Sequence, residues 1–237
     1  MSDSPDTMHD RLRYRSGNVV SNFRNRSERS RLANQIRSYP LFRPPHVTVP
    51  NRLTAEQANE NHCALMDAAE YRTEVIQQLL SSFGVTLSVE NPTIDSIRSL
   101  DAWAYQQWPG IFDKKLWLQI SCTYTFELSD KNLAIRCLLL DLSLLLGNCY
   151  RAVNREAQWM LDNRPGTIED ETTTAHRTVI ETQLQADGVI RGPDVIDPES
   201  HVLSHYGFQK TDNPTLMLNQ RMGQILGEPV SRLLELI

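Results

Sequence analysis

The sequence lacks the short motifs by which most catalytic and nucleotide-binding sites are recognised. It contains no G-x-G-x-x-G or G-K-[ST] phosphate loop, no G-x-S-x-G nucleophile turn and no H-E-x-x-H zinc motif. It has no internal repeat, and its 10 glycines and 12 prolines are too few for a low-complexity chain. These absences argue against nucleotide binding through a known loop and against a serine hydrolase built on that turn.

Cysteine is scarce and widely spaced, which argues against a disulfide framework. No C-x-x-C pair occurs. Isolated thiols of this kind are typical of a reducing compartment. The first residues, MSDSPDTMHDRLRYRSG, also lack the apolar core of a secretory signal, so we expect a cytoplasmic protein. The four cysteines, three of them in apolar runs and expected to be buried, are Cys63, Cys122, Cys137 and Cys149.

A long uncharged apolar run is absent as well. The most apolar stretch, residues 133–150, has only 14 residues between Arg136 and Arg151, and Asp141 is one of them. A membrane-spanning helix needs about 20 predominantly apolar residues. We therefore predict a central core helix and no association with a membrane.

The net charge of −5 conceals a division between the N-terminus and the rest of the chain. Residues 1–43 hold nine arginines against four acids, whereas the remainder holds 15 basic and 25 acidic residues. Such a division suggests either contact with a polyanion or association of the tail with the body. The arginines that would contact nucleic acid are Arg11, Arg13, Arg15, Arg24, Arg26, Arg29 and Arg31.

The N-terminal region has few apolar positions and ends in a proline-rich connector, RPPHVTVPN. We interpret residues 1–51 as an arginine-rich, partly disordered arm and connector, and residues 52–237 as one globular domain. The alternative is a short basic helix that docks on the body through Phe23, Leu32 and Ile36.

Two helices are predicted in the first half of the domain. Thr54 and Gln57 have the spacing of a capping box, and apolar residues then recur at helical steps over 55–83. Thr93 is the expected N-cap of a second helix over 94–108, which Pro109 and Gly110 would end.

Further helices are expected around the apolar run and at the C-terminus. Ser129 is a plausible N-cap for the central helix, which we expect to continue past Gly147 through CYRAVNREAQWML to the turn at NRPG. Asn213 and Pro214 are expected to open a helix that Gly227 ends, with a short final helix after it.

Alternation of apolar and polar residues predicts a small number of strands. VTLSV suggests a short strand, and residues 116–128 alternate over seven repeats. TTTAHRTVIETQ, within the acidic segment 163–200, is a candidate exposed strand. Together the elements predict an α+β fold, mainly helical, with a small antiparallel sheet.

Asp141 is the residue at which local rules conflict, because a carboxylate among leucines is costly unless it is paired or neutralised. Its neighbours one turn away on the helix include no base, so its partner must come from another element. Arg98, Arg151 or a Trp or Tyr donor are the candidates. Asp141 is then a structural buried acid, the wall of a pocket or interface, or a catalytic group.

Other candidate site residues have simpler structural explanations. The spacing of His201 and His205 suits zinc, but no third ligand is marked nearby, so we predict no metal site and no cofactor. Neighbouring His62 and Cys63 point apart on a helix, and burial explains both. The acidic residues in IEDET can form a binding surface or simply be solvated. The tryptophans can line a binding surface or pack in the core. The binding candidates besides Asp141 are Trp103, Trp159, Glu169, Asp170 and Glu171.

One order of features resembles a broad group of uncharacterised bacterial cytoplasmic proteins. It consists of SLDAW, an apolar helix ending LGNCYRAVNREAQW, a polar β-like stretch, VLSHYGF and DNPTLML, over residues 95–227. Some members of that group are immunity proteins of toxin systems. The resemblance implies a non-enzyme and supplies no catalytic residues.

The sequence therefore predicts a non-enzymatic protein-binding module, of immunity or adaptor type, with the segment 163–200 as its main exposed surface. A basic toxin or nuclease would suit its acidic charge. The alternative is a nucleic-acid-binding accessory protein that uses the N-terminal arm. A third class is a hydrolase with an Asp and His site not apparent from the sequence.

Overall fold

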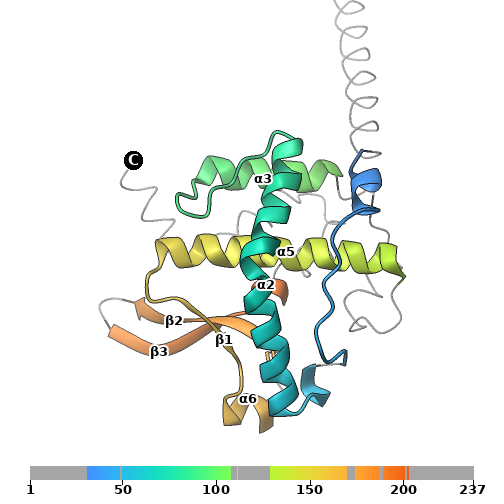
Figure 1. The fold of residues 1–237 in the computed structure, drawn as a ribbon. Coiled ribbons are helices and arrows are strands. Elements are labelled where there is room, and N and C mark those ends of the chain that lie inside the picture. The colour runs from blue at the N-terminus through green and yellow to red at the C-terminus, as the bar shows by residue number, and fades with distance from the viewer. Residues whose placement is uncertain are drawn as a thin grey trace, which may run out of the picture.

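Figure 1 shows the fold in a computed structural model, which describes residues 31–48, 50–107, 111, 129–169, 174–186, 189–200 and 202. Long helices and one small antiparallel sheet make up this part of the chain, so the predicted helical α+β class is confirmed. The predicted strand at 116–128 and the predicted helices after Asn213 lie outside the described residues.

Helix α5, Asp130–Val153, runs through the middle of the fold (Figure 1). It begins at Ser129, whose hydroxyl accepts from the backbone N–H of Asn132, as predicted. By length and composition α5 could cross a membrane, but 89% of its most apolar window is buried in the fold. The prediction of a central core helix is therefore confirmed.

Helix α2, Ala55–Ser82, crosses α5 and packs against it (Figure 1). The predicted capping box is present: Thr54 Oγ1 accepts from the Gln57 N–H at 3.2 Å, and the Gln57 side chain accepts from the Thr54 N–H at 3.1 Å. The helix ends before Gly84, whose φ of 77° lies in the left-handed region that glycine adopts without strain.

Helix α3, Ile94–Gln107, begins where predicted, with Thr93 and Ser96 exchanging hydrogen bonds between side chain and backbone. The strand predicted for VTLSV does not form. Val85 and Leu87 are buried alternately, but the Leu87 carbonyl accepts from the Gln77 side chain at 2.9 Å instead of from a second strand. The side chains of this segment therefore alternate in burial without strand pairing, because a side chain, rather than a second strand, donates a hydrogen bond to its backbone.

The sheet has the order β1-β2-β3, with antiparallel pairing throughout. Its strands are β1, Gln158–Leu161, β2, Thr178–Ala186, and β3, Val189–Ile196, with the short helix α6, Pro165–Glu169, between the first two. The predicted continuation of the central helix to NRPG is thus wrong, because α5 ends at Val153 and QWML pairs with β2.

The candidate strand at TTTAHRTVIETQ forms in its second half, as β2 from Thr178 onward, but it is not exposed. Val179 and Ile180 are fully buried, because β2 lies between its two neighbours and contributes to the core. Gly147 of α5 lets the sheet approach closely, since a Cβ there would lie 2.3 Å from the Trp159 ring.

Part of the region assigned to the N-terminal arm packs on the body. Residues 31–36 are helical, and Leu32, Ile36 and Tyr39 belong to the hydrophobic core. The docked-helix alternative therefore holds for these residues, and the folded body begins before the predicted boundary at residue 52. The reason is that the apolar side chains of this basic segment fill a gap beside α2 and α5.

Candidate functional site

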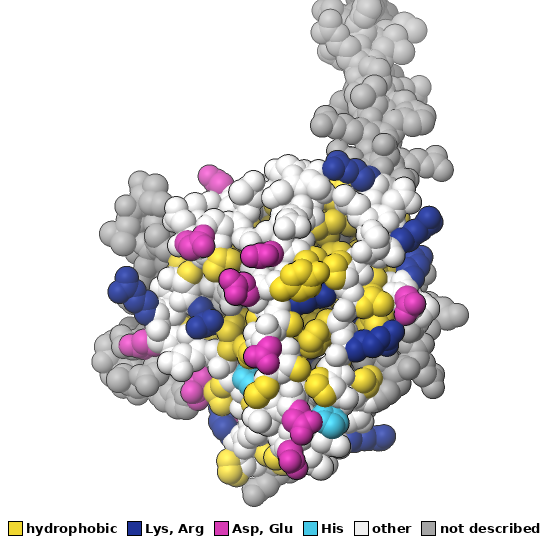
Figure 2. All heavy atoms as spheres, in the orientation of Figure 1, with side chains coloured by type: hydrophobic (Ala, Val, Ile, Leu, Met, Phe, Trp, Pro, Cys, Tyr) yellow, Lys and Arg dark blue, Asp and Glu magenta, His cyan; other side chains and the backbone are white. Residues whose placement is uncertain are grey.

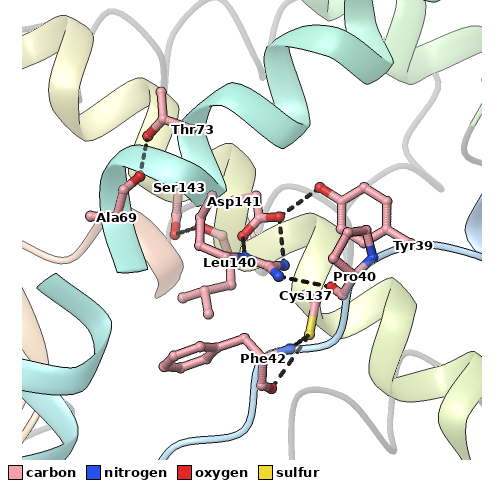
Figure 3. A network of polar contacts seen from close by, with 10 residues as sticks. Tyr39, Pro40, Phe42, Ala69, Thr73, Cys137, Leu140, Asp141 and Ser143 are labelled. Carbon is pink, nitrogen blue, oxygen red and sulfur yellow. Dashed lines mark hydrogen bonds and ion pairs between the residues drawn. The ribbon is translucent and has the colours of Figure 1, made fainter. Parts of the chain in front are cut away.

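Asp141 lies fully buried on α5, where two residues from other elements hold its carboxylate (Figure 3). The Arg72 guanidinium of α2 donates from Nε to Oδ1 and from Nη2 to Oδ2, both at 2.7 Å. The Tyr39 hydroxyl donates to Oδ2 at 2.6 Å. We call Tyr39, Arg72 and Asp141 the closed site.

The electrostatics of the closed site are those of a paired, desolvated carboxylate. Burial raises the pKa of Asp141 to about 6, and the hydrogen bonds and charge of Arg72 oppose that rise. Burial also raises the pKa of Tyr39 strongly, so its hydroxyl stays a donor. Arg72 has a further acceptor in the Pro40 carbonyl at 2.8 Å. Each carboxylate oxygen therefore has a donor, which is the condition for keeping a charge buried.

The predicted partners of Asp141 are partly wrong. A tyrosine donor is confirmed, but Arg98 pairs with Asp95 on the surface and Arg151 donates to the Ala157 carbonyl. Arg72 was missed. Its position three residues after Ala69 places it on the buried stripe of α2, and that spacing could have revealed it.

The closed site offers no room for a substrate. Asp141 and Arg72 are 0% and 2% exposed, and all the contacts among them are internal. The structural interpretation of Asp141 is the one that its geometry supports, and the hydrolase hypothesis finds no support at this residue. His201 and His205 lie outside the described residues.

A partly open cavity of about 120 Å³ lies against the same helix, where its lining residues occur both before and after Asp141. Segment 42–50, α2, α5 and the sheet form its walls, and most of the lining is apolar. Phe42 ties the segment to α5, because its N–H donates to Cys137 Sγ at 3.2 Å. Trp159, proposed from the sequence as a binding residue, lines the cavity and donates from Nε1 to Asn148 at 2.9 Å.

Three histidines stand in the cavity wall, and one of them, His46, pairs with Glu60 through Nε2. His62 of α2 contacts Thr178 Oγ1 through Nδ1 at 3.0 Å, and burial lowers the pKa of its imidazole. His176 precedes β2 with a φ of 58°, which is uncommon for a residue other than glycine. Its Nδ1 donates to the Pro50 carbonyl at 3.2 Å, while its Nε2 is buried without a partner among the described residues.

Ion pairs form part of the cavity wall, through Arg136, Arg177 and Glu199. Arg136 of α5 pairs with Glu199, and Arg177 pairs with Asp197 and Glu199, both at 2.9 Å. Burial disfavours the charged form of both carboxylates. At Glu199 the charges of Arg136 and Arg177 outweigh burial and lower the pKa, whereas at Asp197 burial dominates and raises the pKa. These acids belong to the segment predicted as exposed surface, yet they are largely buried, because they neutralise two arginines of the interior.

The other predicted site residues are dispersed. Trp103 is 4% exposed and packs on Phe83 in the core, at 5.9 Å between ring centroids, away from the cavity. Glu169 ends α6, and Asp170 and Glu171 lie outside the described residues. Among the predicted binding residues that the structure describes, Trp159 is therefore the one that lines the cavity.

Of the seven arginines proposed for nucleic acid, Arg31 is described. It donates to the Ser82 carbonyl at 2.6 Å, and its guanidinium lies 4.8 Å from the centre of the Phe83 ring. These contacts dock the N-terminal helix on α2. The other six, Arg11, Arg13, Arg15, Arg24, Arg26 and Arg29, lie outside the described residues.

The sequence expectation for Cys63 is wrong: the thiol is exposed on α2, whereas Cys137 and Cys149 are buried as predicted. Among the described residues, no group of three or more His, Cys, Asp or Glu side chains is arranged to hold a metal ion. The chain matches no protein-family model, no curated protein and no solved structure, so its function must be argued from these sites alone.

Proposed function

We propose that this is a non-catalytic protein-binding module that docks a basic partner on the exposed face of α2. Five acids on this helix are exposed, and its one arginine, Arg72, is buried in the closed site. No lysine occurs on the helix, so no exposed lysine or arginine of α2 offsets the negative charge. The acidic face consists of Glu56, Glu60, Asp67, Glu70 and Glu74.

The central part of this face is available to a partner. Glu60 pairs with His46, but Asp67, Glu70 and Glu74 make no ion pair with any other described residue. Figure 2 shows Asp and Glu side chains distributed over the face that α2 crosses, with hydrophobic side chains between them.

Tyr71 supplies the apolar contact that a charged surface alone lacks. It is 55% exposed, the highest value among the exposed large hydrophobic residues of the described chain, and it lies between Glu70 and Glu74. Aromatic residues with a polar rim are typical anchors of protein interfaces. An acidic rim around a tyrosine favours fast, electrostatically steered association with a basic surface.

This proposal keeps the predicted function but moves its surface from segment 163–200 to α2, since Asp197 and Glu199 are used internally. An immunity protein that neutralises a basic bacterial toxin, as the sequence resemblance implies, would be one such module. The same acidic face would repel phosphates, which counts against nucleic acid as the partner of the described body.

The test compares two variants with the same change of net charge. One carries Asp67→Asn, Glu70→Gln and Glu74→Gln; the control carries Glu90→Gln, Asp95→Asn and Glu156→Gln, which are exposed acids elsewhere. Each is used to capture proteins from lysate of the native host at low and high salt, with quantification by mass spectrometry.

We expect a basic protein to be enriched by the wild type and the control, and lost from the α2 variant and at high salt. Tyr71→Ala should weaken the same capture at all salt concentrations. Equal enrichment by both triple variants would contradict the proposal.

A further inference from the structure

The cavity is the right size for one small molecule. Its volume of about 120 Å³ approaches the roughly 150 Å³ of an engineered apolar cavity that binds benzene, so a single six-membered ring fits. Its lining comes from α2, α5, the strands β1 and β2, and segment 42–50. The apolar part includes Phe42, Leu65, Leu133, Leu140, Leu144 and Trp159.

The charges around the cavity are already matched. Arg136 and Arg177 face Asp197 and Glu199, two cations against two anions, in direct ion pairs. A charged ligand would have to disrupt this cluster or enter the apolar part without a counter-ion, and either is costly. The cavity therefore suits an uncharged molecule.

His62 offers a polar atom in the wall to a ligand. The Nδ1 atom of His62 contacts the Thr178 hydroxyl. Its Nε2 atom has no hydrogen-bond partner among the described residues, and it is not fully buried, so a ligand can reach it. A neutral imidazole can donate or accept at this atom, depending on the tautomer. His62 thus supplies one hydrogen bond to whatever occupies the cavity.

Two other polar groups of the lining, those of Asn61 and Ser143, are already used. Asn61 exchanges two hydrogen bonds with the backbone of His46, and Ser143 donates to the Leu140 carbonyl at 2.6 Å. The strained backbone of His176 places another imidazole in the wall, where its Nδ1 donates to Pro50 and its Nε2 is buried without a partner among the described residues. The wall is therefore mostly apolar with a few polar positions, among them His62 Nε2, and this combination is typical of small-molecule pockets.

We propose that this cavity is a binding site for a small, uncharged, ring-sized molecule that carries one hydroxyl group, which hydrogen-bonds to His62. This site is separate from the acidic face of α2, so its occupation is a further property of the protein. Phenol represents the ligand class, toluene lacks the hydroxyl, and benzoate and benzylamine carry charges.

Binding of the four probes to the full chain is measured by isothermal titration calorimetry. We expect saturable binding of phenol, about tenfold weaker binding of toluene because one hydrogen bond is missing, and no saturation with benzoate or benzylamine. His62→Leu should remove the preference for phenol over toluene.

Two variants fill the cavity at independent places. Ala58→Leu acts from α2 and Val47→Phe from segment 42–50, and both positions line the cavity. Each should abolish phenol binding, while Ala102→Leu, an exposed site on α3, should leave it unchanged. Circular dichroism verifies that each variant is folded.

The proposal is overturned if phenol does not saturate, if binding survives both filling variants, or if benzoate binds as well as phenol. If toluene binds as tightly as phenol, and His62→Leu changes neither affinity, the proposed hydrogen bond between the ligand hydroxyl and His62 is overturned. These outcomes do not depend on capture of a protein by the acidic face.

Discussion

Two polar regions along α5 differ in how completely their groups are paired. In the closed site, the Asp141 carboxylate receives three hydrogen bonds from Arg72 and Tyr39, and no space remains. In the cavity, an apolar wall surrounds about 120 Å³ and leaves His62 Nε2 without a partner in the described chain. The first region is organised for stability, and the second has room for a ligand.

The same N-terminal segment covers both regions. Tyr39 and the Pro40 carbonyl complete the closed site, and residues 42–50 form one wall of the cavity. The closed site therefore holds this segment on the body, and the segment in turn forms part of the cavity wall. Four substitutions test this contrast.

The largest effect is expected from Arg72→Met, which leaves the Asp141 carboxylate buried without its cation. Breaking such a pair costs about 3–5 kcal/mol of unfolding free energy, measurable by urea denaturation. Arg98→Met, in an exposed pair, should cost about 0–1 kcal/mol. Adding Asp141→Leu to Arg72→Met should restore much of the loss; no restoration would contradict the account of the pair.

Tyr39→Phe removes one donor but leaves Arg72 in place. A hydrogen bond to a charged acceptor contributes about 1.5–3 kcal/mol, so we expect a loss in the lower part of that range by the same measurement. The exposed Tyr71→Phe is the matched control and should be nearly neutral. A loss as small as that of the control would show that the Tyr39 hydroxyl does not support the closed site.

Gly147→Ala tests the contact between α5 and the sheet that helps to form the cavity. Alanine normally favours a helix over glycine, but its Cβ would lie 2.3 Å from Trp159, so we expect a net loss of about 1 kcal/mol in thermal or urea unfolding. At Gly166 of α6 no atom lies within 4 Å of the added Cβ, and Gly166→Ala should not destabilise. Stabilisation by Gly147→Ala would mean that the sheet does not pack this closely.

The smallest effect concerns the pH dependence of His62. Because burial lowers the pKa of its imidazole below 6.5, the unfolded chain binds the proton more readily. Its contribution to stability is therefore present above the unfolded pKa and is lost as the pH falls through the folded value. The free energy of unfolding of the wild type should fall more than that of His62→Leu as the pH is lowered below about 6.5. Parallel pH profiles would show that His62 is not buried in its neutral form.

Local signals predicted the beginnings of the long helices. Thr54, Thr93 and Ser129 are N-caps as expected, because a cap needs only a side-chain oxygen and an N–H within the next turn. The ends and the strands were less predictable. QWML has no local feature that separates helix from strand, and its pairing with β2 decided the outcome.

The candidate site was predictable only in part. An acid among leucines indicated that Asp141 needs a partner, and the helical stripe that contains Arg72 was present in the sequence. Which of several arginines and tyrosines reaches Asp141 depends on the crossing of α2 over α5 and on the docking of residues 31–39. The cavity had no signal at all, since it is a space left between elements.

The amino-acid sequence by itself determined the α+β class, the central apolar helix, the helix caps and the requirement that Asp141 be paired, because each of these depends on neighbours along the chain. The tertiary structure alone decided that Arg72 and Tyr39 are its partners, separated from it by 69 and 102 positions. It also decided that Asp197 and Glu199 turn inward and that α2 presents the acidic face. Side chains far apart in sequence meet only when the elements pack, so the choice among chemically equivalent partners is made by packing.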